Sequence, residues 1–355
     1  MSENPVGFGL LGAGLVAPFH AKSLRSSSKA TLVAVADMNR ERAEKLAKEY
    51  ECKCLTTLDE LLDCPGVEAI CVLTPNHAHH DVVIAAARAG KHVLVEKPPA
   101  MTLRETDSMI AACKEADVRF GIVLQCRVRK AIQAMKKAIE SGRFGRLLHA
   151  DAYMKWFRST EYYLSDGWRS SRASGAGVTV QHAFHYIDLL QYLAGPGKRI
   201  WARMNNLSHP QVDLEDTVLS IIEFESGAQG VVEASTGLWP GTDIRIEING
   251  ENGTAIMLGE RMQTWKFRDE QPEDEEIRRY GSESIQTAAS GPADFAFFDH
   301  KVVIEDMADA IREHQDPCIP AISTRPSLEM VLAMYQSARV GDWVPIPLES
   351  EQGIL

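Results

Sequence analysis

The stretch VTVQHAFHYIDLLQYL, residues 178–193, sets two histidines, a glutamine and an aspartate into an otherwise apolar run. If this stretch is one helix, Gln181, His185 and Asp188 fall on the same face. A neutral His185 is suited to take a proton near neutral pH, because the ordinary pKa of histidine is about 6.5. The same residues also fit a core helix in which His185 is buried and hydrogen-bonded. The pattern predicts a helix and leaves proton transfer and core packing open as roles for His185.

A second stretch, FGLLGAGLVAPFH at 8–20, spaces its glycines in a way that suits a dinucleotide. Gly12 permits a tight turn, Gly14 lets a pyrophosphate approach the backbone, and Ala17 keeps helix and strand close. Asp37 follows about 20 residues later, where its carboxylate can accept from both ribose hydroxyls. A 2′-phosphate would meet like charge there, so NAD is favoured over NADP, although Arg40 nearby speaks for NADP. A tight turn without a ligand is the alternative. The predicted cofactor-binding residues here are Gly12, Gly14, Leu15, Val16 and Asp37.

Two polar segments follow predicted strands, at the edge where open parallel sheets bind ligands. TPN at 74–76 comes after the fourth strand, and EKP at 96–98 comes at the end of the fifth. Lys97 is held in a stiff segment beside two prolines. It is either a functional lysine or an ordinary exposed surface lysine, which is the commoner fate of this residue type.

The first third of the chain alternates strand-like and helix-like segments. Asn39 and Thr102 are suited to begin helices, and Gly90 is suited to end one. Strands joined by helical crossovers run parallel, so residues 1–125 are predicted to form a doubly wound dinucleotide-binding domain of the Rossmann type. The predicted strands are 6–11, 31–36, 52–55, 67–73, 92–96 and 119–124.

Beyond about residue 145 the pattern changes to consecutive strands, with ESGAQ and NGENG as hairpin turns. This predicts an α+β domain over residues 126–355 with a large, mostly antiparallel sheet, for substrate binding and oligomerisation. An acidic, polar segment at 268–291 is predicted to be an exposed loop. The predicted strands are 199–207, 215–225, 228–236, 243–249, 253–259 and 262–268, and two late helices are predicted at 299–315 and 326–339.

Composition narrows the class of protein. The chain has 355 residues, 45% of them hydrophobic and 25% charged, with a formal net charge of −11. This balance disfavours nucleic acid or an anionic membrane as the partner, because both require a basic face. The N-terminus has no secretory pattern, and no run is long enough to span a bilayer. Seven cysteines cannot all pair, which predicts reduced thiols in a soluble, cytoplasmic protein.

The chain resembles the Gfo/Idh/MocA family of NAD(P)-dependent oxidoreductases, which includes glucose–fructose oxidoreductase and inositol dehydrogenases. The stretches that carry the resemblance are GLLGAGLVAPFH, TPNHAHHDVVIAAARAGKHVLVEKP, WRSSRASGAGVTVQHAFHYIDLLQYLAG, PGTDIRIEINGENGTAIML and LEMVLAMYQSARVGDWVPIPL. The resemblance implies a Rossmann domain followed by an open-faced domain whose sheet forms oligomer contacts, so a homodimer or homotetramer is expected. It also implies a sugar, cyclitol or related polyol as substrate.

The resemblance places the catalytic lysine of the family on Lys97 and its catalytic histidine on His185. The family pattern around that histidine is close to D-x-G-x-H-x-x-D, and here Gln181 replaces the first aspartate and Ala183 replaces the glycine. Gln181 can hydrogen-bond a substrate, but it cannot act as a base. SGAG at 174–177 is a further departure, since three consecutive glycines are common there.

The resemblance adds further site residues. Thr74, Asn76 and His79 are expected to line the cofactor, and Glu96 to approach the nicotinamide ribose. A second set, Arg127, Trp168 and Arg169, is expected to contact cofactor or a polyhydroxylated substrate, with surface ion pairs and core packing as the alternatives.

No metal site is predicted. The histidines at 77, 79 and 80 have a spacing that cannot aim all three rings at one ion, so local capping is favoured. His182, His185 and Asp188 have a spacing that can hold a metal, but hydride transfer in this family needs none.

The function that follows is hydride transfer between NAD and a secondary alcohol or ketone of a sugar, cyclitol or derivative. His185 would act as base and Lys97 would stabilise the alkoxide, although the two can exchange roles. Two alternatives remain: an enzyme that retains NAD and cleaves glycosides through transient oxidation, and a non-catalytic dinucleotide sensor.

Overall fold

The computed structural model describes residues 4–175, 177–281 and 297–351. The chain divides into two compact units, the first formed by residues 1–125 and 296–325 and the second by residues 126–295 and 326–355. The segment 296–325 was expected in the second domain. It belongs to the first unit because its helix α11 (Phe298–Glu313) packs on α1 (Ala17–Arg25) and on the first sheet.

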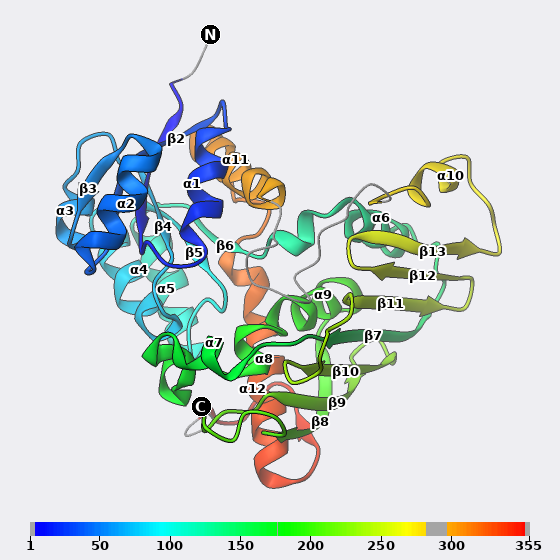
Figure 1. Cartoon of the computed structure of the whole chain (residues 1–355). Helices are drawn as coiled ribbons and strands as arrows, with labels where there is room; N and C mark the ends of the chain where they lie inside the picture. The colour runs from blue at the N-terminus through cyan, green and yellow to red at the C-terminus, as the bar shows by residue number, and fades with distance from the viewer. Residues whose placement is uncertain (1–3, 176, 282–296, 352–355) are drawn as a thin grey trace. The chain divides into compact units, whose positions relative to one another are not determined.

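The first unit is built on a six-stranded parallel sheet, as predicted (Figure 1). Its strand order is β3-β2-β1-β4-β5-β6, in which the chain crosses over between β3 and β4. The central strands β1 and β4 are wholly buried, which explains their continuous apolar runs. The strands are β1 (Val6–Leu11), β2 (Ala30–Ala36), β3 (Lys53–Leu55), β4 (Ala69–Val72), β5 (His92–Glu96) and β6 (Phe120–Val123).

Two helices of the first unit begin where the sequence predicts, after Asn39 and after Thr102. The side chain of Asn39 accepts from the backbone of Arg42 at the start of α2 (Arg40–Tyr50). Thr102 and Glu105 form a reciprocal capping box at the start of α5 (Leu103–Glu115). The other elements are α3 (Leu58–Leu62), α4 (His79–Arg88) and the short 3₁₀ helices η1 (Asn76–Ala78) and η5 (Ala321–Thr324).

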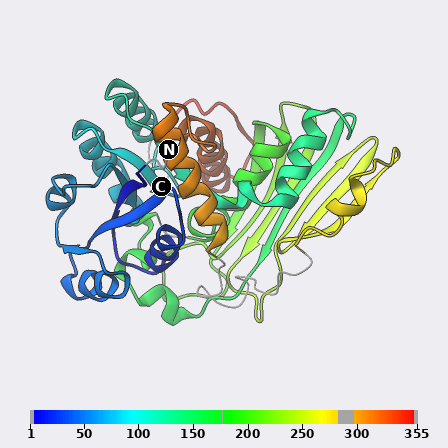
Figure 2. The same cartoon turned by 90° about the horizontal axis from the view of Figure 1, so that it is seen from above.

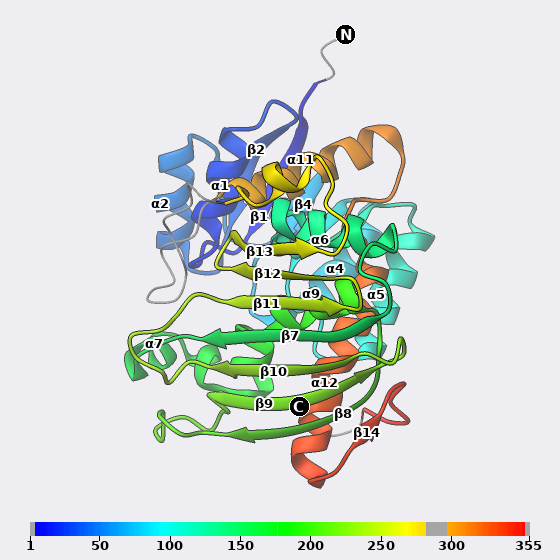
Figure 3. The ribbon, with the colours of Figure 1, turned by 90° about the vertical axis from the view of Figure 1, so that its right-hand side faces the viewer.

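The second unit is built on an eight-stranded sheet in the order β13-β12-β11-β7-β10-β9-β8-β14 (Figure 3). Neighbouring strands are antiparallel except for β7 and β10, so the predicted mostly antiparallel sheet is confirmed. The strands are β7 (Leu147–Lys155), β8 (Gly197–Asn205), β9 (Thr217–Phe224), β10 (Gln229–Ser235), β11 (Arg245–Gly250), β12 (Gly253–Leu258), β13 (Arg261–Phe267) and β14 (Val344–Pro345).

Helices cover one face of this sheet. Figure 2 shows α6 (Lys130–Glu140) and α9 (Phe184–Ala194) along that face, and α12 (Arg325–Val340) lies behind the sheet in Figure 3. On the other face, Leu219, Ile221 and Val231 are exposed. The remaining helical elements are α7 (Thr160–Leu164), α8 (Val178–Gln181), α10 (Asp274–Ile277), η2 (Gln125–Val128), η3 (Gly167–Ser170) and η4 (Arg172–Ser174).

The single helix predicted over 178–193 is two helices. The backbone amide of Ala183 donates to the carbonyl of Val178, five residues back, which closes α8 at Gln181. A second helix, α9, then begins with Ala183 at its N-cap. Gln181 and His185 therefore belong to different helices. The prediction that their side chains share one helical face no longer follows, because it assumed a single continuous helix.

The acidic segment is not wholly an exposed loop. Its described part, 268–281, contains α10, in which Asp274 is fully buried. Asp274 accepts from Arg143 at 2.5 and 2.6 Å and from the indole of Trp265 at 2.6 Å. The ion pair with Arg143 holds the pKa of this carboxyl far below its ordinary value. Residues 282–291 of the prediction lie outside the described residues.

Across residues 4–175, 177–281 and 297–351, every helix is too short or too polar to cross a membrane.

Candidate active site

The glycine-rich turn between β1 and α1 forms a cradle for an anionic group. Gly12 has a φ of 106°, and a Cβ there would lie 2.7 Å from the carbonyl oxygen of Leu73. A Cβ at Gly14 would point into open space with no atom within 4 Å. Because α1 begins directly after this turn, the positive end of its helix dipole lies beside the turn. Leu15, in the turn, is 42% exposed, and Val16 is the N-cap residue of α1.

Asp37 ties the end of β2 to this turn. One carboxylate oxygen accepts from the backbone amide of Ala13 at 2.7 Å, and the other accepts from Asn39 at 2.7 Å. The carboxylate therefore lies against the glycine cradle, where the sequence places it. These residues fit a dinucleotide, because the turn offers unblocked backbone beside a fixed acid.

His79 joins the two polar strand ends. Its Nδ1 lies 2.9 Å from the carbonyl oxygen of Pro98, and its Nε2 lies 3.0 Å from that of Thr74. The ring is fully buried, so it fixes the segments that carry Thr74, Asn76 and Lys97. His79 therefore positions these two segments through hydrogen bonds to their backbone. This agrees with the prediction that the histidines at 77, 79 and 80 bond locally.

Glu96 is held by a histidine that the sequence analysis did not single out. Its Oε1 lies 2.9 Å from Nε2 of His20, a fully buried residue of α1. Burial by itself would raise the pKa of Glu96, but the hydrogen bond from His20 and the charges of His20, His300 and Lys97 lower it to about 2. His20 ends the quoted glycine stretch, so its position was visible. His300 lies on α11, 204 residues beyond Glu96 in the sequence, and no local sequence pattern indicated it.

The ligand atoms of His20, Glu96 and His300 lie within 4.8 Å of one another. The rings of His20 and His300 meet edge to face at 5.2 Å between centroids. The 2.9 Å contact between His20 and Glu96 is a hydrogen-bond distance, so this group acts as a polar support for the segment that carries Lys97. The absence of a metal remains a prediction.

Lys97 directly follows β5 and is partly buried. Its backbone amide lies 3.3 Å from Oε2 of Glu96. Glu96 and Pro98 are each fixed by a buried histidine, so Lys97 sits between two anchored residues.

In the second unit, burial separates the polar residues of the quoted stretch. Between Gly177 and Leu190, Gln181 and His185 are partly exposed while the other side chains are buried. His182 is 6% exposed, and its ring lies 6.3 Å from that of Trp156 between centroids. The polar side chains of this stretch that keep exposed surface are therefore those of Gln181 and His185.

The start of α8 is fixed by Glu215. Its carboxylate accepts from the backbone of Thr179 at 3.1 Å and from the hydroxyl of Tyr335, and its carbonyl accepts from Val178 at 2.9 Å. Gly177 has a φ of 118°, and a Cβ there would lie 2.3 Å from this carboxylate. Gly177 is therefore required, which explains why SGAG keeps its last glycine.

Asp188 is bound to Arg127 in a buried ion pair with two parallel contacts, of 2.7 and 2.6 Å. Ser327 of α12 also donates to Asp188 at 2.6 Å. The pair lies one turn beyond His185 and joins α9 to the η2 segment. Arg127 therefore forms an ion pair, which was the alternative to contact with cofactor or substrate. The pair lies in the interior and not at the surface.

Trp168 and Arg169 lie in η3 among residues that the sequence analysis missed. The guanidinium of Arg169 lies 4.8 Å from the Trp168 ring and 5.1 Å from that of Tyr162. A second guanidinium, of Arg158, lies 5.8 Å from Tyr162. Arg158 and Tyr162 belong to a segment after β7 with no recognisable motif, so no local pattern indicated them.

A shallow hollow of about 510 Å³ lies on the exposed face of the large sheet. It is lined by alternate residues of β7 and β11, which face away from α9. Its walls are Tyr153, Lys155, Thr242, Asp243, Arg245, Glu247 and Leu258.

Comparisons with known proteins agree with this geometry. A profile described as "Oxidoreductase family, NAD-binding Rossmann fold" matches residues 6–123, and a "GFO/IDH/MocA C-terminal domain" profile matches residues 132–256. The scyllo-inositol 2-dehydrogenase (NAD(+)) of Bacillus subtilis is 29% identical over 98% of this chain and 97% of its own. The Myo-inositol 2-dehydrogenase of Thermotoga maritima is 30% identical over 74% and 78%.

A solved structure extends the likeness. The WlbA dehydrogenase from Bordetella pertussis, in complex with NADH and UDP-GlcNAcA, is 29% identical with a TM-score of 0.86. The match covers 98% of this chain and 100% of that one. The chain belongs to the GFO/IDH/MocA family, and it is an NAD-dependent oxidoreductase.

Proposed function

We propose that the protein transfers a hydride between NAD and a secondary alcohol or ketone of a sugar, cyclitol or derivative. The observation that carries the proposal is the glycine cradle fixed to Asp37, with Lys97 held at the end of β5 of the same sheet. The inositol dehydrogenases and the WlbA dehydrogenase among its relatives support the substrate class.

The bound cofactor would supply a hydride acceptor for the alcohol carbon. Gly14, Leu15 and Val16 would hold its phosphates through backbone N–H groups, and the tight turn at Gly12 would let the phosphates approach. Asp37 would hold the adenosine ribose. Thr74, Asn76, His79 and Glu96 would line or support its nicotinamide half. Arg127, Trp168 and Arg169 would contact either the cofactor or the substrate, and for Arg169 the substrate is the contact pursued below.

In the direction of oxidation, His185 would take the hydroxyl proton as the carbonyl forms. The Lys97 ammonium would hydrogen-bond the same oxygen and stabilise its alkoxide character. Gln181 would donate a hydrogen bond to a substrate hydroxyl without exchanging a proton. Asp188, bound to Arg127 and Ser327, would orient α9.

Two substitutions test these roles. Lys97→Ala and His185→Ala should each lower kcat about 10²- to 10⁴-fold, which is the usual contribution of a positioned acid or base. NADH binding, followed by fluorescence titration, should stay nearly unchanged. Lys114→Ala and His149→Ala are matched controls, because both side chains are exposed and lie outside the site. Full activity in either test variant would disprove the assignment.

The two alternatives have separate signatures. A glycoside-cleaving enzyme that retains NAD would release sugar without accumulating NADH, and a sensor would bind the cofactor without turnover. Neither has support among the observations above. A screen of aldoses, uronates and inositols that follows NADH absorbance separates the dehydrogenase from both alternatives. Release of free sugar from glycosides then separates the glycoside-cleaving enzyme from the sensor.

We also propose the cytoplasm as the compartment and a homodimer or homotetramer as the assembly. All seven cysteines are free thiols, as expected in a reducing compartment. The apolar side chains on the open face of the large sheet, Leu219, Ile221 and Val231, support a self-association surface.

A further inference from the structure

An arginine and tryptophan cluster in the second unit lies beside Gln181. We propose that Arg158, Arg169 and Trp156 form an anion subsite that binds the negatively charged group of an acidic sugar, either a carboxylate or a phosphate. The proposal rests on the proposed function, since it specifies the substrate class of the same enzyme.

Two guanidinium groups of the cluster are buried: Arg158 is 3% exposed and Arg169 is 7% exposed. A buried guanidinium attracts an anion more strongly than an exposed one, because little water screens its charge. The charged groups that act on the neighbouring Tyr162 hydroxyl are these two arginines and one carboxylate, that of Asp166. Asp166 is the more exposed partner and lies 3.4 Å from Arg169.

The cluster also offers hydrogen-bond donors that lack acceptors. The indole N–H of Trp156 and the Nε–H of Arg169 are buried, and neither has an acceptor among the described residues. Both groups can only donate. The guanidinium of Arg158 lies 5.0 Å from the Trp156 ring. A carboxylate or phosphate brings several acceptor lone pairs, and its bonds to guanidinium are about twice as strong as neutral ones.

Gln181 connects this cluster to the candidate catalytic residues. Its Nε2 lies 3.5 Å from the Tyr162 hydroxyl, and it is one of the two partly exposed residues of its stretch. The family pattern has an aspartate at this position. An aspartate would repel an anionic substrate, whereas the neutral amide of Gln181 does not. An anionic substrate therefore gives a physical reason for the substitution.

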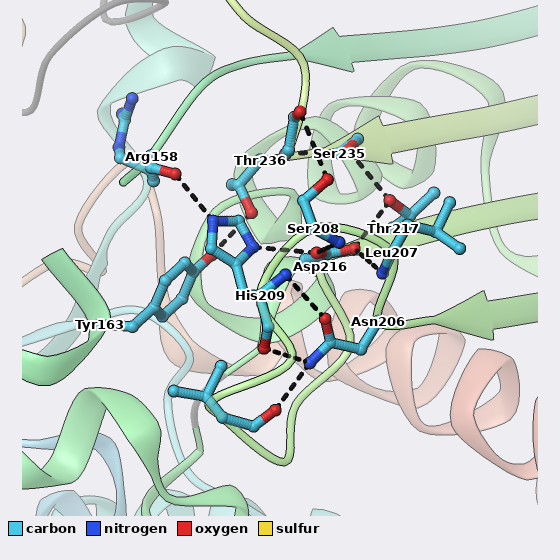
Figure 4. Close-up of polar contacts among 12 residues, drawn as sticks. Arg158, Tyr163, Asn206, Leu207, Ser208, His209, Asp216, Thr217, Ser235 and Thr236 are labelled. Atoms are coloured by element: carbon cyan, nitrogen blue, oxygen red, sulfur yellow. Dashed lines mark hydrogen bonds and ion pairs between the residues drawn. The ribbon is translucent and has the colours of Figure 1, made fainter. Parts of the chain in front are cut away.

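The backbone that carries Arg158 is firmly held (Figure 4). Nε2 of His209 lies 2.8 Å from the Arg158 carbonyl oxygen, and the Arg158 amide donates to Thr236 at 2.8 Å. The hydroxyl of Tyr163 lies 2.6 Å from that of Thr236. In Figure 4 the Arg158 side chain extends away from His209. The arginine is thus presented by an anchored segment, as a preorganised binding residue requires.

Calorimetric titration of the NADH-loaded protein tests the subsite with matched pairs. The pairs are D-glucuronate with D-glucose, D-galacturonate with D-galactose, and UDP-GlcNAcA with UDP-GlcNAc. Glucose 6-phosphate, compared with D-glucuronate, tells whether the anion is a phosphate or a carboxylate. The variants are Arg169→Gln and Arg158→Gln, and Arg172→Gln is the control, since its side chain is exposed three residues from Arg169.

The anionic member of at least one pair should bind about tenfold more tightly or better. Each test variant should weaken that member about 10- to 100-fold, while the neutral member and the control variant stay unchanged. A melting curve for each variant establishes that it is folded. Equal binding of acid and neutral sugar throughout, or equal loss of both in the variants, would overturn the subsite. Turnover of a neutral polyol that requires Lys97 would then still uphold the proposed function.

Discussion

At the scale of single residues, burial and bonding decide which histidine can do chemistry. His79 has both ring nitrogens against backbone carbonyls and is fully buried, so it supports the site from within. His182 is packed against Trp156. His185 lies on α9 and is partly exposed, so it is the one of the three that we propose for proton transfer. Residue type alone does not separate the three.

Asp37 carries a prediction about the choice of cofactor. Asp37→Asn keeps an oxygen that can accept from Ala13 or Asn39 but removes the charge that disfavours a 2′-phosphate. The ratio of kcat/KM for NADP to that for NAD should rise about 10- to 100-fold. This change corresponds to about 1.4 to 2.8 kcal/mol of charge repulsion between Asp37 and the 2′-phosphate, which the substitution removes. Steady-state kinetics with both cofactors measures this ratio. Asp59→Asn, at an exposed position of α3, should leave it unchanged, and an unaltered ratio in Asp37→Asn would refute a discriminating role.

At the scale of elements, the break between α8 and α9 sets the arrangement of the candidate site. The bond from Ala183 to Val178 ends α8, and the carboxylate and carbonyl of Glu215 fix its first turn. The direction of Gln181 therefore depends on a strand-flanking residue that is 34 positions away in the sequence.

Gly177 tests this dependence. Gly177→Ala places a Cβ against the carboxylate of Glu215 and forces a non-glycine residue to a φ of 118°. The free energy of unfolding should fall by about 1–3 kcal/mol from backbone strain alone, and the displaced α8 should lower kcat/KM. Chemical denaturation followed by circular dichroism measures the first effect. Gly167→Ala is the control: its Cβ meets no atom within 4 Å, so its change should stay within about 0.5 kcal/mol.

At the scale of the whole molecule, stability should depend on pH through a buried pair in the second unit. Nδ1 of His209 lies 2.9 Å from Asp216, and both side chains are about 3% exposed. Burial opposes the charge on each. The hydrogen bond to Asp216 nevertheless raises the pKa of His209, and the bonds from His209, Leu207 and Ser208 lower the pKa of Asp216 to about 2.

The sign of the effect follows from these shifts. The His209 contribution is complete below its unfolded pKa of about 6.5 and is lost as pH rises through the raised folded value. The Asp216 contribution is complete above about pH 3.9 and is lost as pH falls through about 2. The difference in melting temperature between the wild type and His209→Gln should thus be largest near pH 5 and shrink towards pH 9. A difference that is constant with pH would contradict a charged His209.

The sequence by itself determined most of the strands of the two sheets and which of the candidate residues stand at strand ends of the first sheet. Buried parallel strands are recognisable in the sequence as continuous apolar runs. Capping residues such as Asn39 and Thr102 mark where helices begin. The glycine turn, Asp37 and Lys97 were found because each lies at a strand end, where chain order alone fixes the position.

The tertiary structure decided which polar groups meet. Arg127 and Asp188 are 61 residues apart in sequence, and no local pattern pairs them. The same holds for His20 with His300, for Glu215 with α8, and for the arginines around Tyr162. Local patterns encode secondary structure because neighbouring residues share one backbone geometry. Contacts between distant residues depend on how the elements pack, and in this protein those contacts orient Gln181, Lys97 and the helix of His185.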